Sequence, residues 1–462
     1  MRRAEEWGRK VPEPPQFRAY LREVCRYVRW KRARGAVKRE LLAHLKDQKE
    51  AFLKEGMEEA EAERQAVLDM GPADAVGLGM DTAYRPKRDW LLVLLALALL
   101  AGGLAVMILG WRQMGTSPIL LEIREETDPI WLKHLPLWMG GGLAAFLLFY
   151  LTGPEAWLKC GWGLPAVYAA AFAVLVHWQS DPTQDGSMWG TVSVDRALRG
   201  AVKIFTLLAP VFGAMLLYRL HGTGLPGAGA SLVLCLVYWG KGRGLADTEG
   251  QIAGALLFAL FFCALWSGWF GGATIKHGCR TWLPPLLALL LLNGGRYYLW
   301  ERINGLVYQF GNNDGWVVDI LDRAKWLGAS TQEIGWAMYW GDSWLLTYGV
   351  YRCGLIVLLA AAVLLALLFA GGLREAFQQR KWFGRMAVLA ALGPLLLVGG
   401  VELGFALGLW AQRGSIPFAY GGYSFVASMA LLGILLAVRR DAALIPGRKA
   451  ESRKRSRMQA AG

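Results

Sequence analysis

The sequence predicts an all-α, polytopic membrane protein with about ten transmembrane helices and a small cytoplasmic helical bundle at its N-terminus. Of its 462 residues, 55% are hydrophobic and 19% are charged, whereas soluble domains carry about a quarter charged residues. The apolar residues form long runs between Trp90 and Val438, and the first 85 residues are polar. These observations exclude a soluble enzyme, a secreted disulfide scaffold and a disordered chain.

The polar N-terminal part divides into a loose, Pro-rich segment, residues 1–16, and a helical domain, residues 17–85. In this domain apolar residues recur at helical spacing, and Gly56 and Gly71 mark the ends of helices. No group of residues in it suggests catalysis, so we expect a spacer or regulatory domain.

Residues 90–438 contain ten runs suited to transmembrane helices, although two are short and nine is an alternative count. They are Trp90–Trp111, Leu135–Thr152, Cys160–Trp178, Arg199–Tyr218, Pro226–Gly240, Gly250–Ala273, Thr281–Leu299, Ser343–Gly371, Met386–Trp410 and Tyr423–Val438. Lys and Arg are more frequent in the segments that fall inside when both termini are cytoplasmic, which favours that orientation. No cleavable signal peptide is expected, because the first apolar run follows a long polar segment.

The net charge of +14 is concentrated towards the chain ends, above all in the basic tail, residues 439–462. Beside a membrane such a tail attracts anionic lipid head groups. Nucleic acid is not expected as a partner, because no basic fold with interleaved aromatic residues accompanies the charge. The six cysteines and five histidines show no ligand spacing, so neither a disulfide nor a metal site is predicted.

The loop between the seventh and eighth predicted spans, residues 300–342, is longer than a helix connection requires, which is typical of functional loops. Part of it predicts an amphipathic helix at the membrane surface, with its apolar face formed by Val317, Ile320, Leu321, Ala324 and Leu327. A surface lid anchored by tryptophans is the alternative.

Residues 408–424 resemble the C-terminal signature of the SEDS (shape, elongation, division and sporulation) proteins, the FtsW/RodA/SpoVE family. The positions that carry this likeness are Ile416, Pro417, Phe418, Tyr420, Gly421, Gly422 and Ser424. The likeness covers residues 90–440 and is strongest in the last quarter. The N-terminal segments Arg22–Arg26 and Ala51–Gly56 look like a permease-prefix-type domain, which is attached to several bacterial membrane proteins.

The resemblance implies a bacterial membrane protein that polymerises lipid II, a disaccharide-peptide on undecaprenyl pyrophosphate, into peptidoglycan strands. The process served would be cell division, elongation or sporulation. The implied partners are a class B penicillin-binding protein, which is a transpeptidase, and divisome or elongation proteins. No cofactor is implied, and a divalent cation at the pyrophosphate stays open.

Two other functions remain open. Where the family has a Glu-Glu pair in the eighth helix, this chain has Val350, Tyr351 and Arg352. A catalytically degenerate scaffold that binds lipid II is therefore one alternative. A transporter is the other, although the sequence has no inverted repeat of broken helices.

Glycosyl transfer from a lipid pyrophosphate needs a base for the attacking hydroxyl and cations for the departing pyrophosphate. Asp342 is the candidate base, because it resembles the aspartate that ends the large outer loop of the family. Its alternative role is to cap the helix that begins at Ser343, and the two roles are compatible.

Four cations are candidate pyrophosphate contacts. Arg196, Arg199 and Lys203 form one stripe at the outer end of the fourth predicted span, and Lys133 begins the second. Charges within a membrane helix usually face a partner or a wet cavity. The alternative is snorkelling to phospholipid phosphates.

Glu402, in the ninth predicted span, is an intramembrane acid and therefore a functional hypothesis by default. A structural pair with Arg352, which is also intramembrane, is the preferred interpretation. Gly421 and Gly422 are expected to permit a tight loop rather than to take part in chemistry.

Overall fold

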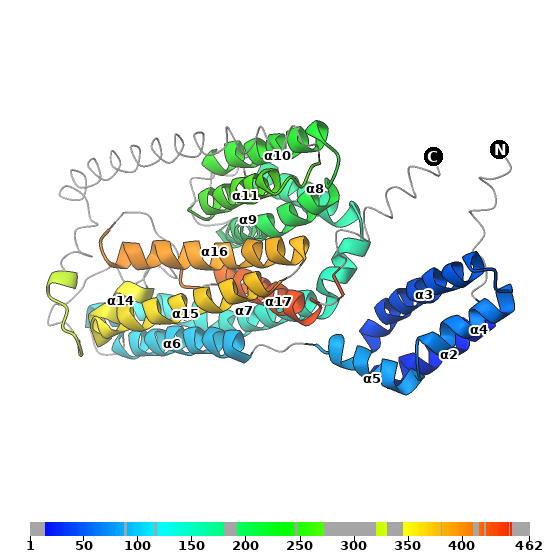
Figure 1. The fold of residues 1–462 in the computed structure, drawn as a ribbon. Helices are drawn as coiled ribbons and strands as arrows, with labels where there is room; N and C mark the ends of the chain where they lie inside the picture. Colours follow the sequence, from blue (N-terminus) through cyan, green and yellow to red (C-terminus); the bar gives the residue numbers. More distant parts are fainter. Residues whose placement is uncertain are drawn as a thin grey trace. The chain divides into compact units, whose positions relative to one another are not determined.

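The computed structural model describes most of the chain, and within the described residues it is helical and has no strand, as predicted. The described ranges are 14–86, 90–114, 118–179, 192–244, 248–271, 320–329, 345–379, 381–409, 415–419, 422–442 and 444–445. The chain divides into two compact units, which are Met1–Arg88 with Arg439–Gly462, and Asp89–Val438 (Figure 1).

The first unit contains a bundle of four helices: α2 (Pro15–Tyr27), α3 (Lys31–Lys54), α4 (Glu59–Asp69) and α5 (Ala73–Ala83). Its apolar residues recur every three or four positions, so that each helix presents one apolar face. The fully buried core includes Phe17, Leu21, Val24, Val37, Leu41, Leu45 and Ala66.

Glycines shape this bundle at two kinds of position. Gly56 and Gly71 have φ angles of 93° and 83°, which side-chain-bearing residues rarely adopt, and each follows the end of a helix. Gly77 lets α5 approach α2, because a Cβ at Gly77 would lie 2.7 Å from Cβ of Tyr27. The helix ends that the sequence predicts at Gly56 and Gly71 are therefore present.

Lys49 links α3 to α4. Its Nζ donates to Glu59 Oε1 at 2.7 Å and to Glu63 Oε1 at 2.6 Å. Burial lowers the pKa of Lys49, but the two carboxylates outweigh it, and the net pKa is raised. The hydrogen bond from Lys49 lowers the pKa of Glu59 below its usual 4.5.

Replacing Lys49 with methionine is expected to weaken the attachment of α4. Hydrogen exchange of the α4 amides at pH 7 should rise roughly two- to fivefold, since exposed ion pairs contribute little each. A carboxyl group whose pKa is lowered in the folded protein stabilises the folded state at pH values above its ordinary pKa. This stabilisation disappears as the pH falls through the lowered pKa. Below pH 4.5 the relative protection of the α4 amides in the native protein should therefore approach that in the variant at the same pH. The matched control is Lys46→Met, an exposed lysine on the same helix, and an equal effect there would contradict the prediction.

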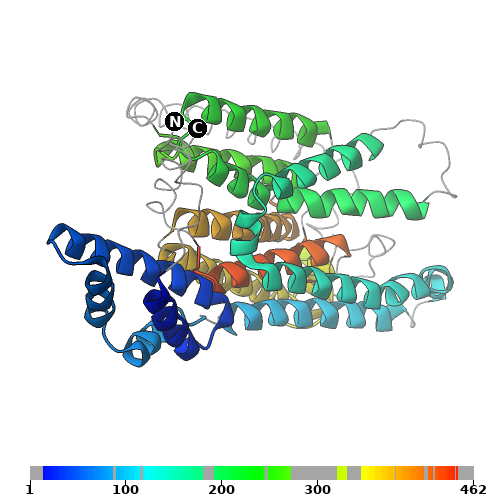
Figure 2. The same ribbon diagram turned by 90° about the vertical axis from the view of Figure 1, so that its right-hand side faces the viewer.

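The second unit contains the apolar helices (Figure 2). They are α6 (Trp90–Met114), α7 (Pro118–Lys159), α8 (Gly163–Gln179), α9 (Val192–Arg219), α10 (Leu225–Gly244), α11 (Thr248–Trp266), α14 (Leu345–Cys353), α15 (Ile356–Gln378), α16 (Trp382–Ala406) and α17 (Tyr423–Arg440).

Six described segments are long and apolar enough to cross a membrane: Leu135–Pro154, Gly200–Arg219, Glu249–Trp266, Ile356–Gln378, Trp382–Ala406 and Tyr423–Arg440. Shorter apolar helices run over Trp90–Val106 and Gly163–Val174. The chain is therefore a multi-pass membrane protein. The described residues do not confirm the count of ten, and the predicted span Thr281–Leu299 lies outside them.

The structure of α7 differs from the prediction for the residues before Leu135. The predicted spans Trp90–Trp111 and Leu135–Thr152 leave residues 112–134 as a connection between them. Instead the helix begins at Pro118 and continues for 42 residues, with a kink at Gly153. Glutamate has high helix propensity, so a charged run next to an apolar run extends the helix.

A second correction concerns the predicted span Ser343–Gly371, which the structure divides into α14 and α15. Gly354, between them, has a φ of 92°, and a Cβ there would lie 2.5 Å from the carbonyl oxygen of Lys325. Leu355 N donates to that same oxygen at 2.9 Å. The membrane-length helix begins only at Ile356, because the long loop occupies the break.

The predicted amphipathic helix of the long loop also ends earlier than expected. Helical backbone ends at Asp322, and Ile320 is buried, whereas Leu327 is exposed. Gly328 N donates to the carbonyl oxygen of Cys353 at 3.0 Å. The prediction that the apolar face continues to Leu327 is wrong, because the backbone of residues 325–328 instead forms hydrogen bonds with residues at the helix break. The preceding residues of that face lie outside the described chain.

Candidate functional site

Helices α7, α9 and α17 meet at an aromatic contact. A Cβ at Gly200, on α9, would lie 2.0 Å from ring atoms of Tyr423, the first residue of α17. The Tyr423 ring also meets Trp138 of α7 edge to face, with ring centroids 4.5 Å apart. Gly200 thus permits a ring–backbone contact that any larger residue would obstruct. The first turn of α17 is fixed against two other helices.

Lys203 lies one turn beyond Gly200, inside the apolar stretch of α9. Its Nζ is 3.8 Å from Oε1 of Glu249, near the start of α11. The Lys203 side chain is 41% exposed and that of Glu249 is 12% exposed. The Lys203 side chain therefore lies beside a carboxylate and is only partly buried. Charges in membrane helices commonly have such partners.

The signature loop is held by small residues of neighbouring helices. A Cβ at Gly399, on α16, would lie 2.9 Å from Cδ of Pro417, and one at Gly103, on α6, would lie 3.0 Å from Cβ of Ala419. Phe418 is buried and has a φ of 64°, a conformation that costs a non-glycine residue about 1–2 kcal/mol. Burial of the ring compensates for this strain, and the loop has a defined shape.

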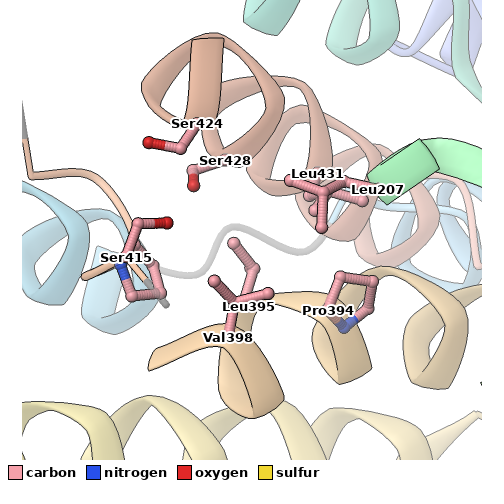
Figure 3. A pocket seen from close by; sticks show the side chains of 9 residues that line it. Leu207, Pro394, Leu395, Val398, Ser415, Ser424, Ser428 and Leu431 are labelled. Atoms are coloured by element: carbon pink, nitrogen blue, oxygen red, sulfur yellow. The ribbon is translucent and has the colours of Figure 1, made fainter. Parts of the chain in front are cut away.

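A small pocket of about 10 Å³, room for about one water molecule, lies between α9, α16 and α17. Figure 3 shows Ser415, Ser424 and Ser428 at one end of this pocket. The other end is formed by Leu207, Pro394 and Leu431 (Figure 3). The serine end can donate and accept hydrogen bonds, so the signature loop forms one wall of an amphipathic cavity.

The structure describes only some of the predicted site residues together with their side chains. Lys203, Pro417, Gly422 and Ser424 lie in or beside the features above. Arg196, Arg199 and Lys133 have helical backbone, but their side chains lie outside the described part, as do Asp342, Tyr420 and Gly421 altogether. On the backbone of α9, the three basic positions keep the predicted register of i, i+3 and i+7.

Glu402 and Arg352 lie on helices that contact each other, α16 and α14. Glu402 is buried, and Arg352 is half-buried. Their pairing stays a prediction.

Three contributors to the site were not predicted. Glu249 is the ion partner of Lys203, and Gly200 and Trp138 position Tyr423. A signal for Glu249 was present, because an acid at the start of an apolar helix needs a partner. No sequence signal identifies the Gly200–Tyr423 contact, which joins residues more than two hundred positions apart.

No family model and no curated protein matches the sequence. The structure is similar to a chain of a peptidoglycan synthase complex that coordinates polymerization and crosslinking. The two are 21% identical with a TM-score of 0.53, over 77% of this chain and 98% of the other. An aspartate-to-alanine variant of the Thermus thermophilus rod shape determining protein RodA is also similar, at 18% identity and a TM-score of 0.48, over 77% and 98% of the two chains.

The fold and the described site thus define a multi-pass helical membrane protein with a charged pair and a serine-lined pocket. The chain shares the fold of the peptidoglycan synthase chain, which confirms the fold that the resemblance predicts.

Proposed function

We propose that the chain is a SEDS-type protein of the bacterial cytoplasmic membrane that extends peptidoglycan glycan strands from lipid II. The observation that carries this proposal is the common fold with a peptidoglycan synthase chain over nearly the whole of that chain. The residues that resemble the family signature form one wall of the pocket, which supports a role for them in the same region.

In the proposed reaction Asp342 takes the proton from the attacking sugar hydroxyl. The hydroxyl oxygen forms the new glycosidic bond to the anomeric carbon. The bond from that carbon to the phosphate oxygen breaks, and the lipid pyrophosphate leaves with the electron pair. Lys203, Arg199, Arg196 and Lys133 receive the anion, because cations stabilise charge that develops on a leaving group.

The partial exposure of Lys203 supports its part in this reaction. Its side chain is 41% exposed, and its Nζ lies 3.8 Å from Glu249 Oε1. Glu249 also keeps the cation compensated when no substrate is bound. Placement of this end of α9 at the outer leaflet belongs to the proposal and follows from the charge distribution of the sequence.

The proposal is tested with purified full-length protein, with and without a class B penicillin-binding protein, given lipid II. Polymer separated on a gel is the expected result, and the transpeptidase partner should increase it. Binding of lipid II without polymer, both with and without the penicillin-binding protein, would instead support the degenerate scaffold. The absence of the Glu-Glu pair at Val350–Arg352 favours that alternative. If the protein neither binds lipid II nor forms polymer, both the enzyme and the degenerate scaffold are contradicted.

Replacing Lys203 with methionine is expected to weaken lipid II binding about ten- to a hundredfold, since a hydrogen bond to a charged group contributes roughly 1.5–3 kcal/mol. The measurement is the dissociation constant for lipid II in detergent micelles, compared with that for undecaprenol, which lacks the pyrophosphate. Undecaprenol binding should not change. Lys325→Met, at an exposed lysine of the long loop, is the matched control, and equal losses in both variants would refute a specific contact.

A further inference from the structure

The first unit joins the two ends of the chain. The residues that follow α17 turn back on themselves, because Leu444 N and Ile445 N both donate to the carbonyl oxygen of Asp441, at 2.8 and 3.2 Å. These residues belong to the same compact unit as helices α2 to α5. We call Asp441–Ile445 the C-terminal clasp.

An ion network attaches the clasp to the bundle. Asp441 is 1% exposed. Arg440 Nε donates to Asp441 Oδ1 at 2.6 Å, and Arg440 Nη2 donates to Oδ2 at 2.9 Å. Arg32 Nη1, from the first turn of α3, lies 3.7 Å from Oδ2. A buried carboxylate is tolerated only when such cations compensate it.

The charge of α3 explains why an acid is needed there. Its first turn contains Lys31, Arg32 and Arg34 and no acidic residue, and Trp30 at the N-cap makes no side-chain cap. The positive end of the helix dipole adds to this charge. Asp441 supplies the missing negative charge from the far end of the sequence.

Leu444 adds an apolar contact to the ionic one. It is 6% exposed and belongs to the same buried cluster as Phe17, Val24 and Val37. Ile445, next to it, is fully buried. The core of the N-terminal bundle is therefore completed by a side chain more than four hundred residues away in the sequence.

We infer that the C-terminal clasp is an integral part of the N-terminal bundle, so that the stability of the bundle depends on residues that follow α17. Asp441 compensates the basic first turn of α3, and Leu444 completes the buried cluster. Loss of the clasp should therefore loosen α2 and α3. This inference does not depend on the proposed function.

The first experiment tests the dependence of the bundle on the clasp, by hydrogen exchange of the full-length protein in nanodiscs. Leu444→Asp should raise exchange in α2 and the first half of α3 at least tenfold and leave α9 and α16 unchanged. Ala442→Asp, in the same segment but at a partly exposed position, should have little effect. Unchanged exchange in Leu444→Asp would refute the clasp.

A pair of truncations makes the test independent of any substituted side chain. A chain ending at Ile445 keeps the clasp and should retain the native exchange of α2 and α3. A chain ending at Arg440 keeps the basic end of α17 but loses Asp441 and Leu444, so its bundle should exchange at least tenfold faster. Equal exchange in the two truncated chains would contradict the inference, provided that α16 exchanges normally in both.

Discussion

Asp342→Asn is expected to reduce polymerisation about 100- to 10,000-fold, which is the contribution of a positioned general base. Asparagine has nearly the same shape but cannot accept the proton. It caps helices about as well as aspartate, so the capping role of Asp342 is preserved. The variant separates the two roles that the sequence leaves open.

The measurement is polymer formed from lipid II, together with the dissociation constant for lipid II, which should stay within a few-fold of the native value. The matched control is Asp322→Asn, because Asp322 is an exposed carboxylate of the same long loop. Native activity in Asp342→Asn would exclude it as the base. Normal activity in Asp342→Asn and strong unfolding in Asp342→Ala together would assign it to capping alone.

Gly200→Ala is the second change with a large expected effect. The new Cβ would lie 2.0 Å from the Tyr423 ring, and that ring already touches Trp138. Either the ring or α17 must move, at a cost typical of overpacking, about 1–3 kcal/mol. We expect a lower midpoint of thermal unfolding and, under the proposed function, reduced polymerisation.

The control is Gly400→Ala on α16, where a Cβ would meet nothing within 4 Å. Adding Tyr423→Ala to Gly200→Ala removes the steric conflict, so the double variant should be more stable than the sum of the single effects predicts. Strict additivity, or equal destabilisation by the Gly200 and Gly400 substitutions, would show that the contact does not constrain the helices.

Hydropathy predicted the membrane helices well where a single apolar run corresponds to a single helix. Met386–Trp410 and Tyr423–Val438 were placed within a few residues of α16 and α17. The run Ser343–Gly371 was wrongly predicted as one helix, because the composition of the sequence does not change at Gly354, where the helix breaks. That break depends on a positive φ and on the carbonyl groups of Lys325 and Trp326, which approach from the long loop.

The candidate site was predicted in part for a similar reason. The depth of Lys203 in an apolar helix is a local property and is visible in sequence. Its ion partner Glu249 and the aromatic contact at Gly200 are tertiary contacts between distant helices. The pocket wall was foreseen only through the signature, since no local rule indicates that Ser415 and Ser428 face one cavity.

The continuity of α17 has a mechanical consequence. It is a single helix of 18 residues, about 27 Å long, with Tyr423 at its first position and the clasp directly after its last. A helix of this length transmits axial displacement and rotation with little internal deformation. A rotation or axial shift of α17 therefore acts directly on the Tyr423 ring and strains its contact with Gly200.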